Sequence, residues 1–196
     1  MRRVAAVHLR RAREWGVFDP AGLDPRALVD RPEPVVVDCV DLSEPAANAV
    51  VRVLARGCYD HTLSGDADRL PWLLIDEAHV RFDGVAGPAL DRLFTRGRAP
   101  GVSVVCATQR PAALPATAVS QADLLVAHAL TSEADVSQLA ATRPTYLDGE
   151  FRARLPDERG VALVVDDTSE VAHTVRVRGR RTPHGGGTPR VSERRR

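Results

Sequence analysis

Two short apolar runs, each ending in a polar pair, constrain the fold of this chain more than any other feature. Residues 72–75 (Trp-Leu-Leu-Ile) lead into Asp-Glu at 76–77, and residues 102–107 lead into Thr-Gln at 108–109. Such near-continuous apolar runs are typical of strands that are covered on both faces of a sheet. A helical pattern that opens with Pro88 separates them. This alternation of strand and helix predicts an α/β fold with a mainly parallel sheet.

The rest of the chain continues the alternation. The other expected elements are a helix over residues 4–15 that Gly16 stops, a buried strand over 35–40, a helix from Ser43 to about His61, a strand over 124–127, a helix capped by Ser132 and Asp135, and a closing hairpin of residues 161–165 and 171–177. In open parallel sheets, ligands sit beyond the carboxyl ends of the strands. Both polar pairs fall at such ends, and this coincidence predicts an active site there.

Composition sets the broad class. The 196 residues are 44% hydrophobic, which is enough for one folded domain with a sizeable core. No apolar run approaches the ~18 residues of a membrane span, and no secretory signal is visible, so a cytoplasmic protein without membrane contact is expected. The three cysteines are widely spaced and form no C-x-x-C pair, so reduced, buried thiols are expected at Cys39, Cys58 and Cys106.

The net charge of +1 hides an uneven distribution. Residues 1–14 have a balance of +4 and residues 178–196 a balance of +6, whereas residues 15–177 have a balance of −9. The basic ends are either arms that contact nucleic acid or ordinary solvated tails, and composition leaves both open. Every basic residue is Arg, and Lys is absent.

The acidic pair after the first strand has the pattern of a Walker B element. A rigid strand would hold Asp76 where it binds the Mg²⁺ of a nucleotide, usually through water. Glu77 would then face the γ-phosphate, where it orients and deprotonates a water molecule. The alternative is purely structural, with two acids that cap a strand end or pair with Arg.

The second polar pair would complete such a site from the neighbouring strand. The amide of Gln109 both donates and accepts, so it can contact the γ-phosphate and the attacking water together, with Thr108 beside it. Arg98 lies on the turn before this strand and is the candidate arginine finger for a neighbouring subunit. A solvated Arg at a helix end is the equally open interpretation.

At these residues the chain resembles the HerA/FtsK superfamily of hexameric DNA-pumping ATPases. The similarity is carried by residues 73–79 and 98–111, and it is closer to the HerA-like branch, although Ala99 stands where that branch has Lys. Weaker similarity extends over residues 15–177, at the segments 18–22, 120–124, 155–156 and 160–164.

The resemblance implies a RecA-like (ASCE) P-loop NTPase core. In this view residues 17–177 are the Walker B and sensor half of the core, while residue pattern and composition give an N-terminal helix (1–16) and a basic disordered tail (178–196). The resemblance also implies ATP and Mg²⁺ as cofactors, DNA as the partner and a homo-hexamer. Residues 76–79 also spell the DEAH box of another helicase superfamily, but the downstream motifs of that superfamily are missing.

One part of the family pattern is missing from the sequence. A P-loop requires G-x-x-x-x-G-K-[ST], and a chain without Lys cannot contain it. The first strand of the core and its P-loop are therefore expected to be absent, which would leave neighbouring strand edges unpaired. Three interpretations follow: the C-terminal part of a motor ATPase, which alone would bind ATP poorly; a subunit completed by a chain that supplies the Walker A strand; or a non-catalytic interaction module.

Overall fold

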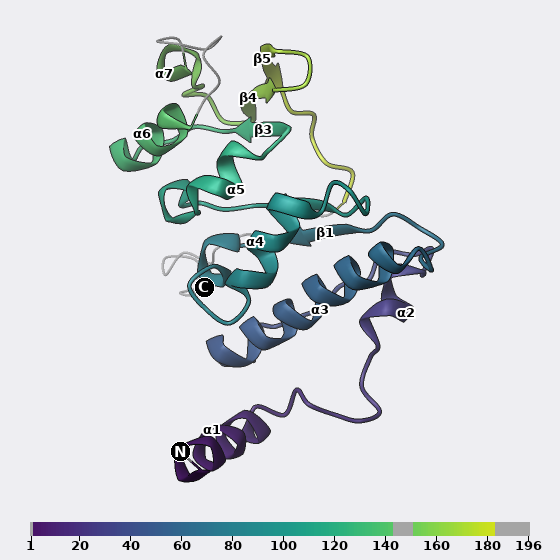
Figure 1. Cartoon of the computed structure of the whole chain (residues 1–196). Coiled ribbons are helices and arrows are strands. Elements are labelled where there is room, and N and C mark those ends of the chain that lie inside the picture. Colours follow the sequence, from purple (N-terminus) through teal and green to yellow (C-terminus); the bar gives the residue numbers. More distant parts are fainter. Residues whose placement is uncertain (1, 143–150, 183–196) are drawn as a thin grey trace, which may run out of the picture.

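The computed structural model describes residues 2–142 and 151–182, whose strands form two separate small sheets (Figure 1). In chain order the elements are α1 (Arg2–Glu14), α2 (Pro25–Val29), α3 (Glu44–Ser64), β1 (Trp72–Ile75), the 3₁₀ helix η1 (Ala78–Arg81), α4 (Gly87–Arg96), β2 (Ser103–Cys106), the 3₁₀ helix η2 (Pro111–Ala113), α5 (Ala116–Ser120), β3 (Leu124–Ala127), α6 (Glu133–Ala141), α7 (Phe151–Arg154), β4 (Val161–Asp166) and β5 (Val171–Arg176).

The first sheet is the parallel pair β1–β2. Ile75 lies opposite Cys106 in the register, and the pairing continues past both strands. The amide of Ala107 donates to the carbonyl of Ile75, and the amide of Ala78 donates to the carbonyl of Ala107, each at 2.9 Å. The prediction of two neighbouring parallel strands is confirmed. Both polar pairs consequently leave the sheet at the same edge.

Helices α3 and α4 cover one face of this sheet and form the main core with it. Helix α4 buries Ala89, Leu90 and Leu93, which share one side because residues three and four apart face the same way on a helix. They pack with Ile75 of β1, and Leu90 is fully buried. This core therefore holds the β1–β2 pair against the helices and fixes where its carboxyl edge lies.

The opposite face of β1 is open, which contradicts the prediction of a strand buried on both sides. Trp72 is 69% exposed and Leu74 is 68% exposed. Val105, which lies opposite Leu74 on the same face, is 38% exposed. An apolar run shows that a strand is suited to burial, but it does not show that a covering element exists. Within the described residues, helices cover only one side of this pair.

The second sheet has the order β3-β4-β5 and is antiparallel throughout. The closing hairpin β4–β5 was predicted correctly, and Asp166 organises its turn by accepting from the amide of Thr168 at 2.9 Å. The expectation of one mainly parallel sheet is wrong for the described residues, because β1–β2 is their single parallel pairing. Strand β3 pairs with the returning strand β4, which reverses the local direction.

The strand predicted over residues 35–40 is absent. These residues form no ladder, and Val36 and Val40 are 89% and 85% exposed. A β-branched run favours the extended backbone, but a strand also requires a neighbour with a free edge in register. No described strand pairs with this segment, and its apolar side chains remain in solvent.

The predicted helix starts and stops agree with the structure at several positions. Helix α1 ends before Gly16, which takes the left-handed conformation at φ +67°. Ser132 caps α6 by accepting from the amide of Asp135 at 3.4 Å. Ser43 occupies the N-cap of α3 without a side-chain hydrogen bond. Figure 1 shows α1 set apart from α3 and joined to the rest by residues 15–24.

Two other features of the chain bear on the sequence expectations. In the described part of the chain, no helix is both long and apolar enough to cross a membrane. Most of the expected basic tail, residues 183–196, lies outside the described residues.

Candidate functional site

The acidic pair sits where β1 ends and the chain turns into η1. Asp76 is exposed, and its Oδ1 accepts from the amide of Glu77 at 3.0 Å. Glu77 has a φ of +47°, in the left-handed region that non-glycine residues rarely adopt. This backbone turns the Glu77 side chain away from the course of the strand, and the side chain is 42% exposed. The carboxylates of Asp76 and Glu77 therefore point in different directions, although the two residues are neighbours in sequence.

The polar pair after β2 meets Glu77 across the strand edge. Gln109 donates from Nε2 to Oε1 of Glu77 at 2.5 Å, although 32 residues separate them in sequence. Thr108 accepts at Oγ1 from the amide of Arg110 at 3.0 Å, which closes a tight turn after the strand. The parallel β1–β2 pairing brings these groups together. The proximity of Glu77 and Gln109 follows the expectation from the sequence, whereas their roles in catalysis stay predictions.

A third group, His79, joins the cluster, although it is not among the candidate residues from the sequence. His79 lies in η1, and its side chain is only 14% exposed. Its Nδ1 is 3.0 Å from Oγ1 of Thr108 and 3.4 Å from Oε2 of Glu77. Its position three residues after Asp76, in the turn that follows β1, is a local hint, but the sequence does not show which oxygens surround its ring.

Arg98 lies at the other end of β2. It precedes Ser103, whereas Thr108 follows Cys106, so the strand runs between Arg98 and the cluster around Glu77. Its side chain is 84% exposed, and Nη2 lies 3.2 Å from Oδ1 of Asp123. An exposed pair of this kind contributes about 0–1 kcal/mol. Arg98 is therefore not part of this chain's own cluster, and its assignment as a finger for a neighbouring subunit remains a prediction.

The residues of this cluster fit Mg²⁺, but they fit ATP only in part. Among the described residues, no three His, Cys, Asp or Glu side chains gather as a metal cage. Mg²⁺ does not require one, because it keeps several waters and uses one or two carboxylates. The exposed Asp76 fits that mode. For the phosphates of ATP the fit is incomplete, since the sequence contains neither a P-loop nor any Lys.

The thiol closest to the cluster along the chain is Cys106 at the end of β2, two residues before Thr108. It is a free thiol, and burial raises its pKa to about 11. A thiol with such a pKa stays protonated at neutral pH and is a poor nucleophile. Burial also raises the pKa of Cys58, which is buried as predicted, whereas Cys39 and Cys106, also predicted to be buried, are only half-buried. Cysteine chemistry therefore contributes nothing to this site.

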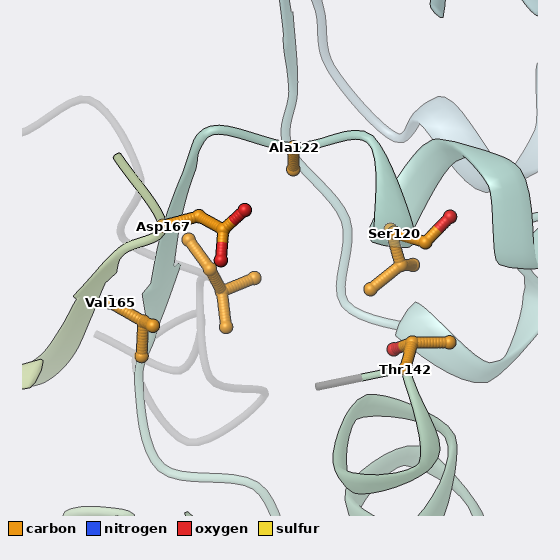
Figure 2. A pocket seen from close by; sticks show the side chains of 7 residues that line it. Ser120, Ala122, Thr142, Val165 and Asp167 are labelled. Carbon is orange, nitrogen blue, oxygen red and sulfur yellow. The ribbon is translucent and has the colours of Figure 1, made fainter. Parts of the chain in front are cut away.

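Two cavities lie elsewhere. The first has a volume of about 30 Å³ and is lined by Val119, Ser120, Ala122, Leu125, Thr142, Val165 and Asp167. Figure 2 shows the carboxylate of Asp167 among these side chains. This volume suits about one water molecule, not a nucleotide. An open groove of about 510 Å³ lies between α2 and α3, beside Arg26, Arg52 and Arg56. Neither cavity is lined by residues of the Glu77 cluster.

Comparison with known proteins gives a structural likeness alone. No family model matches the sequence, and no curated protein matches it. The genome-packaging NTPase B204 of Sulfolobus turreted icosahedral virus 2, solved with AMPPCP, matches with a TM-score of 0.62 at 18% identity, over 81% of this chain and 73% of that one. The same NTPase with ATP-gammaS matches with a TM-score of 0.61 at 18% identity, over 84% and 76%.

The chain shares the fold of a packaging NTPase. At this identity the likeness supports a relationship to P-loop ATPases at the level of fold, and it does not favour the HerA-like branch over others. It agrees with the α/β class predicted from the sequence. The activity of this chain has to be argued from its own residues.

Proposed function

We propose that this chain carries the Walker B and sensor half of a HerA-like, ATP-driven DNA motor. The observation that supports this best is the contact from Gln109 Nε2 to Glu77 Oε1 across the carboxyl edge of the parallel β1–β2 pair. Structural capping alone would not require an amide from a second strand to reach the same carboxylate. Asp76, exposed beside them, is the proposed Mg²⁺ residue, acting through water.

The roles of the side chains follow from their chemistry. Glu77 would accept a proton from the attacking water, which requires its carboxylate to be ionised and within reach of that water. Gln109 would orient the water and contact the γ-phosphate, with the Thr108 hydroxyl as a second donor. Mg²⁺, when bound near Asp76, would neutralise charge on the phosphates. Arg98 would serve the site of a neighbouring subunit in a homo-hexamer.

The phosphate-binding loop of such a site would come from outside these 196 residues. The sequence contains no Lys to hold the phosphates, so we expect these residues alone to show little or no ATP hydrolysis. The loop would belong either to further coding sequence of the same protein or to a partner chain. Reading the genomic DNA before Met1 for a G-x-x-x-x-G-K-[ST] segment, in frame or one shift away, distinguishes the two.

The proposal is tested by Glu77→Gln in a protein that includes the loop, either an extended chain or a complex with the partner. Removal of a general base costs roughly 10²- to 10⁴-fold in rate, so kcat for ATP hydrolysis should fall by at least about 100-fold while nucleotide binding persists. Glu170→Gln, on the exposed β4–β5 turn, is the matched control and should leave kcat unchanged. Equal rates in the wild type and the Glu77 variant would refute the proposed site.

A second candidate function is favoured by the open face of β1. Trp72 and Leu74 are each more than two-thirds exposed, and exposed apolar groups of this kind are often covered by another protein. The chain would then be an interaction module that retains the ATPase scaffold. This alternative predicts that partner binding is indifferent to changes at Asp76 and Glu77 and sensitive to Trp72→Ser, which a pull-down with the encoded neighbours measures.

A further inference from the structure

The carboxylate of Glu77 is held from two sides with unequal contacts. Oε1 accepts the short hydrogen bond from Gln109. Oε2 is fully shielded from solvent and has no partner of good hydrogen-bond geometry among the described residues. A shielded carboxylate oxygen without a donor is costly, because it has lost water without replacement. The nearest group able to relieve this cost is Nδ1 of His79, at 3.4 Å.

The ring nitrogen of His79 faces two oxygens together. Oγ1 of Thr108 lies at 3.0 Å and Oε2 of Glu77 at 3.4 Å from the same Nδ1. Oγ1 of Thr108 already accepts from the amide of Arg110, and a hydroxyl oxygen has two lone pairs, so a second acceptor position remains. Oγ1 of Thr108 can therefore accept a hydrogen bond from the ring N–H, and its own hydroxyl hydrogen is free to point elsewhere.

These contacts favour one tautomer of the ring. If Nδ1 carried no proton, its lone pair would face a shielded carboxylate oxygen, which is repulsive. With the proton on Nδ1, the ring donates to Thr108 and offers the same hydrogen, at longer range, to Glu77. The ring is mostly buried, so it cannot exchange these partners for water. The arrangement thus selects the Nδ1–H form.

We propose that His79 is the positioning residue for Glu77, and that it couples the carboxylate to Thr108 through the single proton on Nδ1. The catalytic part of this inference rests on the proposed function, whereas the contact between His79 and Glu77 is independent of it. His79 steadies a carboxylate whose backbone sits in the left-handed region at φ +47°. It also links the end of β1 to the end of β2 by side chains, in addition to the backbone ladder.

The coupling gives the site a resting and a working arrangement. In the resting arrangement seen here, Gln109 donates to Oε1 of Glu77 and Nδ1 of His79 lies 3.4 Å from Oε2, so a neighbour occupies the position beside each carboxylate oxygen. A phosphate that drew the Gln109 amide towards itself would free Oε1 of Glu77, and one that also drew away the Thr108 hydroxyl would leave the Nδ1 hydrogen of His79 to Oε2 alone. Glu77 would then be free to accept a proton from water, so hydrolysis would be tied to occupation of the phosphate position.

The first test is on the 196-residue chain itself and needs no nucleotide. Imidazole ¹⁵N correlation spectra should show His79 with the proton on Nδ1. Glu77→Gln and Thr108→Val should each shift the His79 ring signals, whereas Glu170→Gln should not. A proton found on Nε2 with a bare Nδ1, or a His79 signal that is indifferent to both site variants, overturns the inference whatever the chain's activity.

The second test uses the hydrolysing form that includes the loop. Loss of a partner that orients a reacting group commonly costs about 10- to 100-fold, so His79→Ala should lower kcat by at least about tenfold with little change in KM. His79→Asn places an amide donor near the Nδ1 position and should restore most of the rate. Thermal unfolding of both variants separates loss of fold from loss of positioning.

Each pattern of results has a distinct meaning. If the spectra show an Nδ1 proton that responds to Glu77→Gln, but hydrolysis does not depend on Glu77, the contact stands and the proposed function is refuted. If hydrolysis depends on Glu77 but is unaffected in a folded His79→Ala variant, the proposed function stands and the positioning role of His79 is refuted. His79→Asn that behaves like His79→Ala, while folded, would also refute it.

Discussion

At the residue scale, contacts between partly buried titratable groups decide how the chain responds to pH. The clearest case outside the candidate site is Asp30, at the C-terminal cap of α2. Its Oδ2 is 2.9 Å from Nε2 of His61, and its Oδ1 accepts from the amide of Asp68 at 3.1 Å. The hydrogen bond with His61 is the main cause that lowers the pKa of Asp30 below 3.8. The contact ties α2 to α3 and to the loop before β1.

The lowered pKa of Asp30 makes a prediction about acid stability. A carboxyl whose pKa is lower in the folded chain adds stability above its unfolded value and loses it as the pH falls through the folded value. The free energy of unfolding should therefore drop as the pH falls below about 3.8. Asp30→Asn should remove part of that dependence in urea titrations at pH 7 to 3. An identical pH slope in both proteins would contradict the role of this contact.

At the element scale, the two faces of the β1–β2 pair behave oppositely. Helices α3 and α4 cover one face, where Leu90 is buried, whereas Leu74 on the other face is exposed to solvent. Leucine therefore contributes very differently to the free energy of unfolding on the two faces. The position of the candidate site depends on the covered face, because that packing keeps β1 and β2 in register.

Leu→Ala substitutions on the two faces measure this contrast. Leu90→Ala removes a fully buried side chain and should lower the free energy of unfolding by about 2–5 kcal/mol. Leu74→Ala, at a side chain that is 68% exposed, should change it by less than about 0.5 kcal/mol. Chemical denaturation of both variants tests the difference. A large cost at Leu74 would mean that its face is covered in solution.

At the scale of the whole molecule, charge is separated along the chain. The N-terminal fourteen residues have a balance of +4 against −9 for residues 15–177, and α1 stands apart from α3 (Figure 1). A separate basic helix can approach a phosphate backbone without bringing the acidic body close to it. The DNA contact that we propose for a motor of this kind would begin here, although it would be independent of sequence.

The salt dependence of DNA binding checks this proposal. If the five Arg of residues 1–14 neutralise duplex phosphates, log K should fall with log salt at a slope of about −4 to −5. Changing Arg10, Arg11 and Arg13 together to Gln should reduce that slope by about 3 in a filter-binding titration. The same three substitutions should leave the thermal unfolding temperature nearly unchanged. Binding that is absent, or that does not respond to salt, would remove α1 as a DNA contact.

Much of the candidate site could be predicted because its signals are local. The acidic pair at 76–77 and the polar pair at 108–109 each follow an apolar run, and a helix between two strands favours parallel neighbours. His79 could not be assigned in this way. Its meaning depends on which oxygens surround its ring, and Thr108 is 29 residues distant in sequence.

The sequence by itself determined the α/β class, the order of the main elements from α3 onwards and the residues that leave the ends of β1 and β2. These follow from periodicity, helix caps and strand ends, which involve neighbours a few residues apart. Only the tertiary structure decided that the strands split into two sheets, that residues 35–40 stay unpaired and that one face of β1 is open. Strand pairing and the burial of a sheet face depend on which segments, distant in sequence, pack beside a strand. The apolar run of the strand does not specify those segments.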